Sequence, residues 1–372
     1  MRTRLKPLSG AAYEEAAGAF ECRGELLYRR RRIAEAERHF DEALARGADP
    51  MNSAQSRWMC AMLRGDFAHA WTISDAVLRA RGAARCTGLP HHLRWVWDGR
   101  PLTGKRVLVL CYHGLGDTLQ FARFVPLLAR TAKSVTIEAQ SELLGLLRSL
   151  EGATALVPLD GIVPDYDVDI EVMELPHALR ITLDTLPADV PYFRVPRDRL
   201  RRARHLVRPV GERFKIGLVW SAGGWKPERS VPFPLLAPLS ALPGVALFNL
   251  QLGPARDVAV GSELAARFIR AFDDTPDILD TAALMAELDL VVTVDTMAAH
   301  LAGAFGRRVW TLLHFASDWR WMIERCDSPW YPTMRLFRQE APEAWSGVMA
   351  KVVAALEIEL SRLGTLPGTP SF

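Results

Sequence analysis

Residues 106–118 read Arg-Val-Leu-Val-Leu-Cys-Tyr-His-Gly-Leu-Gly-Asp-Thr, and this stretch decides the fold class. Its first six residues form a short apolar run, which is typical of a strand buried inside a parallel sheet. A loop with two glycines follows, and the amphipathic stretch 118–129 predicts a helix. A strand, a loop and a helix in this order begin a βαβ unit. The sequence therefore predicts an α/β fold with a parallel sheet covered on both faces.

The same alternation continues along the chain and is interrupted once. Pro187, Pro191 and Pro196 break the pattern, which predicts a hinge or a domain boundary. The alternation resumes after them, so the sequence predicts two Rossmann-like domains, with a last amphipathic helix over 343–363. Strands are expected over 106–111, 134–138, 167–172, 215–220, 245–250, 290–295 and 309–313, and helices over 118–129, 142–150, 234–242, 278–288 and 296–305.

Residues 1–85 show a different pattern, in which apolar and small residues recur at steps of three and four. Ile33-x-x-Ala36 is followed 34 residues later by Phe67-x-x-Ala70. A period of 34 with small residues where helices touch resembles the tetratricopeptide repeat. Two interpretations stay open: the segment is a surface for a protein partner, or it is a structural cap on the α/β part.

The composition is that of a globular protein of two or three domains, with 372 residues, 49% hydrophobic and 24% charged. A net charge of +3 is too balanced for a protein that binds nucleic acid or a membrane surface. The five scattered cysteines lack CxxC spacing, which argues against a zinc site or a disulfide framework and fits a reduced cytoplasm. The N-terminus leads into no apolar segment, and no run approaches the roughly 18 apolar residues of a spanning helix.

Ligands of open α/β sheets bind beyond the carboxyl ends of the strands, so the loops there are the first place to look for a site. In the loop 112–118, Gly114 and Gly116 permit a tight turn and a close approach to a ligand. Asp117 follows at the start of a helix, where it is either a helix cap or a general base directed into an interdomain cleft. His113 is a second catalytic candidate in this loop. The pattern is not GxGxxG, and no GxxxxGK[ST] motif occurs, which argues against a dinucleotide fold and a P-loop.

The loop 221–232 combines Gly223 with Lys226 and Arg229. A flexible backbone with two cations suits a pyrophosphate, although a surface turn with solvated charges would show the same spacing.

A third candidate begins at Asp295, which ends a predicted strand just before a helix that starts at Thr296. The N-terminus of a helix presents N–H groups and the positive end of its dipole to an anion. His300 lies about one turn into this helix, where a packed role is the commoner one, and Asp295 alone could serve as a cap.

Two further features have simpler explanations available. The aromatic stretch 314–338, which includes Trp319, could stack on a base or a sugar ring or could pack between domains. Asp165, Asp167 and Asp169 alternate along a predicted strand, which explains them better than a metal site does.

Three segments form a pattern when they are taken together. They are Gly114-Leu115-Gly116-Asp117-Thr118-Leu119-Gln120-Phe121-Ala122-Arg123, then Asp295-Thr296-x-x-x-His300-Leu301, and then Asp318-Trp319-Arg320-Trp321 followed by Ser328-Pro329-Trp330-Tyr331-Pro332. With these segments, residues 104–340 resemble the sugar-transferase domain of the bacterial lipopolysaccharide heptosyltransferases (glycosyltransferase family 9). With the helical repeats in front, the chain resembles tetratricopeptide-repeat bacterial glycosyltransferases.

This resemblance implies a GT-B architecture, in which two Rossmann-like domains face each other across a cleft, here after a short all-α tetratricopeptide-like segment. It divides the chain into that segment (1–85), an N-terminal Rossmann-like domain on the acceptor side (86–195, beginning with a connector over 86–103), and a C-terminal Rossmann-like domain on the nucleotide-sugar side (196–342). Residues 343–372 would be a helix that packs back on the first Rossmann-like domain, and a tail. The implied activity is an inverting glycosyltransferase of hexosyl or heptosyl type, without a cofactor or a metal.

The resemblance also assigns roles to single residues. Asp117 would be the general base, with His113 as the other catalytic candidate. The donor would be an ADP- or UDP-linked sugar and the acceptor a glycan or a protein hydroxyl, with a possible protein partner bound through residues 1–85. Donor-binding residues would be Gly223, Lys226, Arg229, Gln251, Gly253, Asp295, Thr296, Met297 and His300, and acceptor or cleft residues Gly114, Gly116, Gln120 and Trp319.

One position departs from the family pattern, because heptosyltransferases usually carry glycine after Asp-Thr and this chain carries Met297. A side chain there restricts the approach of the backbone to a phosphate. Two alternatives therefore stay open: a non-catalytic, degenerate transferase that serves as a protein-binding scaffold, and a GT-B nucleotide-sugar epimerase.

Overall fold

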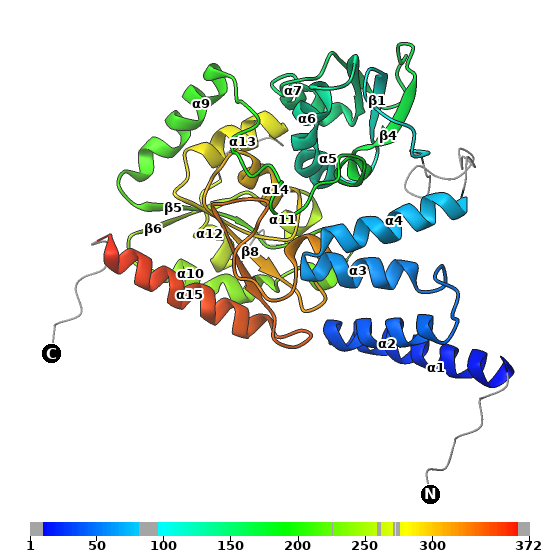
Figure 1. Ribbon diagram of the computed structural model, residues 1–372. Coiled ribbons are helices and arrows are strands. Elements are labelled where there is room, and N and C mark those ends of the chain that lie inside the picture. Colours follow the sequence, from blue (N-terminus) through cyan, green and yellow to red (C-terminus); the bar gives the residue numbers. More distant parts are fainter. Residues whose placement is uncertain are drawn as a thin grey trace, which may run out of the picture. The chain divides into compact units, whose positions relative to one another are not determined.

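Two parallel β-sheets carry the α/β part of the chain (Figure 1). The computed structural model describes residues 10–81, 96–224, 226–258, 262–270, 272 and 276–363. The first part of the predicted connector (86–95), Cys86 and the tail from residue 364 lie outside these ranges. Contacts divide the chain into a helical unit and a larger α/β unit that contains both sheets.

The first sheet has the strand order β3-β2-β1-β4, and the second has the order β6-β5-β7-β8-β9. Every neighbouring pair is parallel; in the first sheet Val109 pairs with both Ile137 and Ile170. The strands are β1 (Arg106–Cys111), β2 (Ser134–Ala139), β3 (Ala155–Pro158) and β4 (Val168–Glu171), then β5 (Phe214–Val219), β6 (Val245–Asn249), β7 (Leu290–Val294), β8 (Val309–Leu313) and β9 (Met334–Arg338). The predicted parallel α/β fold is confirmed.

Mostly short helices connect these strands. Around the first sheet they are α5 (Leu115–Phe121), α6 (Val125–Ala129), α7 (Ser141–Leu147) and α8 (Leu175–Ala178). Around the second they are α9 (Arg197–Val207), which packs on α13, then α10 (Ala237–Ser240), α11 (Pro254–Val258), α12 (Glu263–Ala266), α13 (Ile278–Ala286) and α14 (Met297–Ala304), and the longer α15 (Trp345–Arg362) follows the last strand. None of the helices within the described residues is both long and apolar enough to cross a lipid bilayer.

The two helices predicted to contain internal prolines are broken at those prolines. The helix expected over 118–129 is α5 and α6 with a 3-10 turn (Ala122–Phe124) between them, because Pro126 cannot donate a hydrogen bond to the carbonyl of Ala122. The helix expected over 234–242 is likewise a 3-10 turn (Phe233–Leu236) and the short α10, which contains Pro238. Sequence reasoning also missed β3, β9 and the strongly basic helix α9.

The last helix, α15, belongs to the core of the second sheet (red in Figure 1). Its buried face carries Trp345, Val348, Val352 and Leu356, which lie in one hydrophobic cluster with the side chains of β5 and β7. This differs from the expectation that the helix packs on the first Rossmann-like domain. The apolar stripe of α15 therefore completes the domain that precedes it in the sequence.

The helical unit consists of α1 (Gly10–Arg29), α2 (Ile33–Ala45), α3 (Ala54–Arg64) and α4 (Phe67–Arg81). The two copies of the predicted repeat open α2 and α4, with Ile33, Ala36, Phe67 and Ala70 all buried. The 34-residue period therefore corresponds to two consecutive helical hairpins. Their assignment to the tetratricopeptide repeat stays a prediction.

Two short segments distant in sequence, 180–186 and 318–325, also belong to this helical unit. Trp71 donates a hydrogen bond from Nε1 to the carbonyl of Ile181 at 2.6 Å, and Arg180 forms a bidentate ion pair with Asp75. The backbone N–H of Ile323 donates to the carbonyl of Leu63. Two segments that lie between α/β elements in the sequence therefore hydrogen-bond to these helices.

The buried cysteines of the described residues serve as apolar side chains. Cys22, Cys60, Cys111 and Cys326, the four within the described residues, are all free. Burial raises the pKa of the Cys60 thiol to about 12, and it raises that of Cys111 as well. Both buried thiols therefore stay protonated and act as small apolar side chains.

The buried guanidinium of Arg123 joins the elements of the first sheet to the segment between the sheets and to the loop between β8 and β9. Arg123, 4% exposed, donates from Nη1 to the carbonyl of Trp330 at 2.5 Å and to that of Pro187 at 3.2 Å. Its Nη2 donates to the hydroxyl of Tyr192, and its Nε donates to the carbonyl of Gln120 in its own turn. Five donors in a fixed plane make Arg the side chain suited to such a junction.

Replacing Arg123 with Met is expected to lower the free energy of unfolding by about 3 kcal/mol, because it leaves several buried acceptors without a donor. Urea unfolding measures this difference. Arg130→Met, which removes an exposed arginine seven residues later, should change the value by less than about 0.5 kcal/mol. Equal stabilities of the two variants would contradict the role of Arg123 as a junction.

Candidate functional site

The strand orders of the two sheets indicate where a ligand would bind. In the first sheet the chain reverses direction beside β1, which has β2 on one side and β4 on the other; in the second it reverses beside β5, between β6 and β7. The crevice outside the carboxyl ends of the strands at such a point is the general ligand site of open α/β sheets. The loops after β1, β4, β5 and β7 therefore define the candidate site.

Asp117 lies in the first turn of α5, directly after β1. Its Oδ2 accepts a hydrogen bond from the backbone N–H of Gly114 at 3.0 Å. The interpretation of Asp117 as the N-cap is wrong, because the helix begins earlier than expected: Gly114 is the N-cap, and Asp117 lies three residues later. The Asp117 side chain is half-buried.

His113 precedes this turn and contacts an acidic residue at the end of β4. Its Nε2 lies 2.5 Å from Oε1 of Glu171, which is 9% exposed, and the hydroxyl of Tyr112 donates to Oε2 of Glu171. The carbonyl of His113 accepts from Nε2 of Gln140, whose Oε1 accepts from the hydroxyl of Thr118. Sequence reasoning missed Glu171, although an acid ending a strand beside the reversal point is the signal that could have found it.

The second sheet contributes an acid, an arginine and a helix N-terminus. Asp295 follows β7 and is buried, and its Oδ2 lies 3.3 Å from Nη1 of Arg229, in the loop after β5. The hydroxyl of Thr296 accepts from the N–H of Ala298, which makes Thr296 the N-cap of α14. The first N–H of that helix, at Met297, has no intrahelical acceptor by its position. The arrangement places one cation and an N-terminal N–H at the end of β7.

The helices that follow β1 and β7 meet at a glycine. A Cβ placed on Gly116 would lie 2.8 Å from Cδ2 of His300 and 3.5 Å from Cα of Met297, so only glycine allows this approach. Nδ1 of the buried His300 ring lies 3.0 Å from the hydroxyl of Tyr331. The turn that carries Asp117 and the start of α14 are therefore brought together.

Gln251 ties the loop after β5 to the loop after β6. Its Oε1 accepts from the backbone N–H groups of Trp220 and Ser221 at 3.0 and 2.8 Å. Its Nε2 donates to the carbonyls of Ser221 and Leu252. This buried amide holds the shape of the loops, and Gly253 follows with φ +72°, a backbone conformation that favours glycine.

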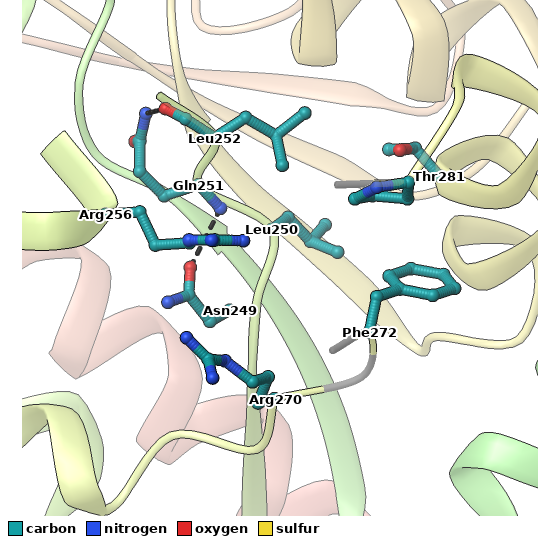
Figure 2. A pocket seen from close by; sticks show the side chains of 9 residues that line it. Asn249, Leu250, Gln251, Leu252, Arg256, Arg270, Phe272 and Thr281 are labelled. Atoms are coloured by element: carbon teal, nitrogen blue, oxygen red, sulfur yellow. Dashed lines mark hydrogen bonds between the residues drawn. The ribbon is translucent and has the colours of Figure 1, made fainter. Parts of the chain in front are cut away.

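A pocket lies beside Gln251 at the carboxyl end of β6 (Figure 2). Figure 2 shows the side chains of Arg256 and Arg270 on one side and those of Phe272 and Thr281 on the other. Two guanidinium groups and an aromatic ring suit a planar ligand that carries negative charge. Its lining residues are Asn249, Leu250, Gln251, Leu252, Arg256, Arg270, Phe272, Pro276 and Thr281. Sequence reasoning did not identify the two arginines.

Four other predicted residues lie in different settings. Gly223, with φ +78°, and Lys226 are exposed in the loop after β5. Gln120 is fully buried in α5, and neither atom of its amide has a partner among the described residues. Trp319 lies in the helical unit, where its ring packs edge-on against Trp58 at 5.4 Å.

The acidic residues around β4 do not form a common site. Asp167 accepts from the backbone N–H and the guanidinium of Arg106, and these hydrogen bonds lower the pKa of Asp167 to about 2. This pair lies at the amino end of the strands, away from the loops described above. Among the described residues, no group of three or more histidines, cysteines or acids could hold a metal ion.

Comparison with known proteins gives one relative in sequence. No protein-family model matches the chain. Protein FlbA of Caulobacter vibrioides is 28% identical over 289 residues, which cover 70% of this chain and 48% of FlbA. The chain therefore spans about half the length of this relative.

Comparison of structures gives the fold. A glycosyl transferase family 9 structure from Veillonella parvula has a TM-score of 0.52 and 14% identity, and the match covers 71% of this chain and 99% of that one. The ADP-heptose lipopolysaccharide heptosyltransferase II of E. coli matches more weakly, with a TM-score of 0.45 and 14% identity over 68% of this chain and 99% of its own. The α/β part thus shares the fold of a family 9 glycosyl transferase, as the sequence motifs predicted.

Replacing Gly116 with Ala is expected to lower the free energy of unfolding by about 1–3 kcal/mol, because its methyl group would overlap the buried His300 ring. The matched control is Gly347→Ala in α15, where a Cβ has open space and stability should be unchanged or higher. Thermal and urea unfolding of both variants check this contact. Wild-type stability of the Gly116 variant would show that α5 and α14 are not packed closely.

Proposed function

We propose that the α/β part is a glycosyltransferase that moves a sugar from a nucleotide-diphosphate sugar to a hydroxyl acceptor. The observation that carries this proposal is the contact of Gly116 with His300, which brings the turn of α5 that contains Asp117 against the N-terminal end of α14. A carboxylate and an anion-binding helix N-terminus on facing elements are the two groups that transfer from a diphosphate leaving group requires. The shared fold with a family 9 glycosyl transferase supports the same conclusion.

The donor would lie along the second sheet. Its diphosphate would bind at the N-terminus of α14, beside the guanidinium of Arg229, which Asp295 orients. Its nucleoside would lie against the loops beside Gln251, near Arg256 and Phe272, because the cavity there, about 20 Å³, has room only for water. Stabilisation of the leaving diphosphate by fixed donors would supply much of the catalysis, without a metal ion.

The acceptor would approach from the first sheet. Asp117 would take the proton of its hydroxyl while the oxygen attacks the anomeric carbon from the face opposite the diphosphate, so that the configuration inverts. The hydrogen bond from Gly114 fixes the Asp117 carboxylate for this role. The acceptor would be a glycan or a protein hydroxyl, and the helical unit would be the surface that binds a protein acceptor.

Nucleotide binding tests the donor half of the proposal. Thermal stability is measured with ADP, UDP, GDP, dTDP and CMP, each in EDTA and in magnesium. A nucleotide at 100 times its dissociation constant should add roughly 2.7 kcal/mol. We expect one diphosphate to stabilise the protein in EDTA, and Arg229→Met to weaken that effect. No stabilisation by any nucleotide would favour a non-catalytic scaffold instead.

Asp117→Asn tests the acceptor half. With the donor identified by binding, transfer should fall about 10²–10⁴-fold, because the amide cannot accept the proton. Stabilisation by the nucleotide should be retained. Asp165→Asn, which alters an exposed acid, is the control and should keep wild-type turnover. Wild-type turnover by the Asp117 variant would rule out this residue as the base, and sugar modification without any acceptor would indicate an epimerase.

A further inference from the structure

The helical unit carries a groove of about 520 Å³ that the transfer of a sugar does not use. It lies along α1, and residues of α2, of the turn before α3 and of α3 itself complete its lining (Figure 1). All of these elements belong to the helical unit. The volume of the groove is within the range of ligand sites, about 300–1,000 Å³.

Two polar atoms in the lining of this groove are buried without a hydrogen bond. Ser53 is only 6% exposed, and its Oγ has no partner among the described residues. Oε1 of the half-buried Glu21 likewise has no partner within the described part of the chain. Because a polar atom removed from water without a partner destabilises a protein, both atoms indicate a ligand that completes their hydrogen bonds.

Ser53 lies at a position where a serine ordinarily serves its own helix. It is the N-cap of α3, and an N-cap hydroxyl usually accepts a hydrogen bond from a backbone N–H of the first turn. Here the side chain makes no such bond. The hydroxyl is therefore available to a ligand in the groove, as a donor or as an acceptor.

The charges in the groove select the chemistry of that ligand. Glu25 is already neutralised, because its Oε1 accepts from Nε of Arg29 at 3.0 Å and its Oε2 accepts from the hydroxyl of Ser56 at 2.6 Å. Glu21, one turn earlier on α1, forms no ion pair with a described residue. A cation is the strongest donor to a carboxylate, so the ligand would present an ammonium or a guanidinium group to Glu21.

The shape of the groove suits an extended chain. Its lining on α1 runs from Glu21 to Arg29, a rise of about 12 Å, which about three or four residues of an extended chain would span. Leu26 adds an apolar surface between these ends and is 47% exposed. Gly24 fixes the wall of the groove, since a Cβ there would lie 2.7 Å from the buried ring of Phe40.

We propose that this groove binds an extended segment of a partner protein that carries a lysine or an arginine. Its cation would lie on Glu21, its backbone on the Ser53 hydroxyl and an apolar side chain on Leu26. That the segment belongs to the acceptor of the sugar rests on the proposed function, whereas the binding itself does not.

A library of random heptapeptides displayed on phage, selected with the full-length protein, tests this inference. The retained peptides are expected to be enriched in lysine or arginine beside an apolar residue. A selected peptide is then synthesised with a fluorescent label and titrated with the protein. Glu21→Gln, which removes the charge and keeps the shape, should raise the Kd at least about tenfold.

Glu35→Gln is the matched control, because Glu35 lies on α2 outside the groove and should leave the Kd unchanged. Ser53→Ala should raise the Kd about fivefold and leave the midpoint of thermal unfolding as it is, since the hydroxyl does not cap α3. A selection without basic residues, or equal binding by the two glutamine variants, would overturn the inference. A less stable Ser53 variant that binds normally would assign the hydroxyl to the helix and overturn its role.

The labelled peptide also separates this inference from the proposed function. If it binds through Glu21 and the chain transfers sugar to no acceptor, the proposed function fails while the groove stands. If the chain transfers sugar to a glycan but selects no basic peptide, the function stands and the groove fails.

Discussion

The buried guanidinium of Arg123 is the constraint on which the α/β unit depends. It lies in the turn after α5, and its donors reach carbonyls at Pro187, in the segment between the sheets, and at Trp330, after β8. A charge removed from water needs a full set of acceptors, and these carbonyls and the Tyr192 hydroxyl supply them. Three parts of the chain far apart in sequence are therefore fixed relative to one side chain.

Two glycines allow the helices near this junction to pack closely. Gly303 of α14 leaves room for the ring of Tyr331, since a Cβ there would lie 2.6 Å from it, and Gly116 of α5 leaves room for His300. The two helices can then approach closely enough for the loops after β1 and β7 to share one space. Packing, rather than a flexible loop, thus sets the spacing between the proposed base and the proposed diphosphate site.

Much of the fold could be predicted, because buried parallel strands are short apolar runs and the motif around Asp117 is local in sequence. Strand β3 is only four residues long and α9 has few apolar residues, so neither shows a clear periodic pattern in the sequence. Pro126 lies in a stretch whose apolar pattern is otherwise that of one continuous helix, so the break there was missed. The start of a helix at Thr296 could be predicted, because a strand that ends in Asp295 is followed at once by a helical pattern. Glu171 and the pocket arginines became visible only in three dimensions, since their neighbours are brought near by the topology. Trp319, which was predicted to line the cleft, packs instead against Trp58 of the helical unit, a contact between residues far apart in sequence that no local pattern indicates.

The segments 180–186 and 318–325 leave the α/β unit and return to it after packing among the N-terminal helices. The helical unit is therefore built from three separate parts of the chain, and it cannot be removed at a single point. Deletion of residues 10–81 would leave the carbonyl of Ile181 without Trp71 and the guanidinium of Arg180 without Asp75. A shortened chain would keep two loops that have lost the helices on which they pack.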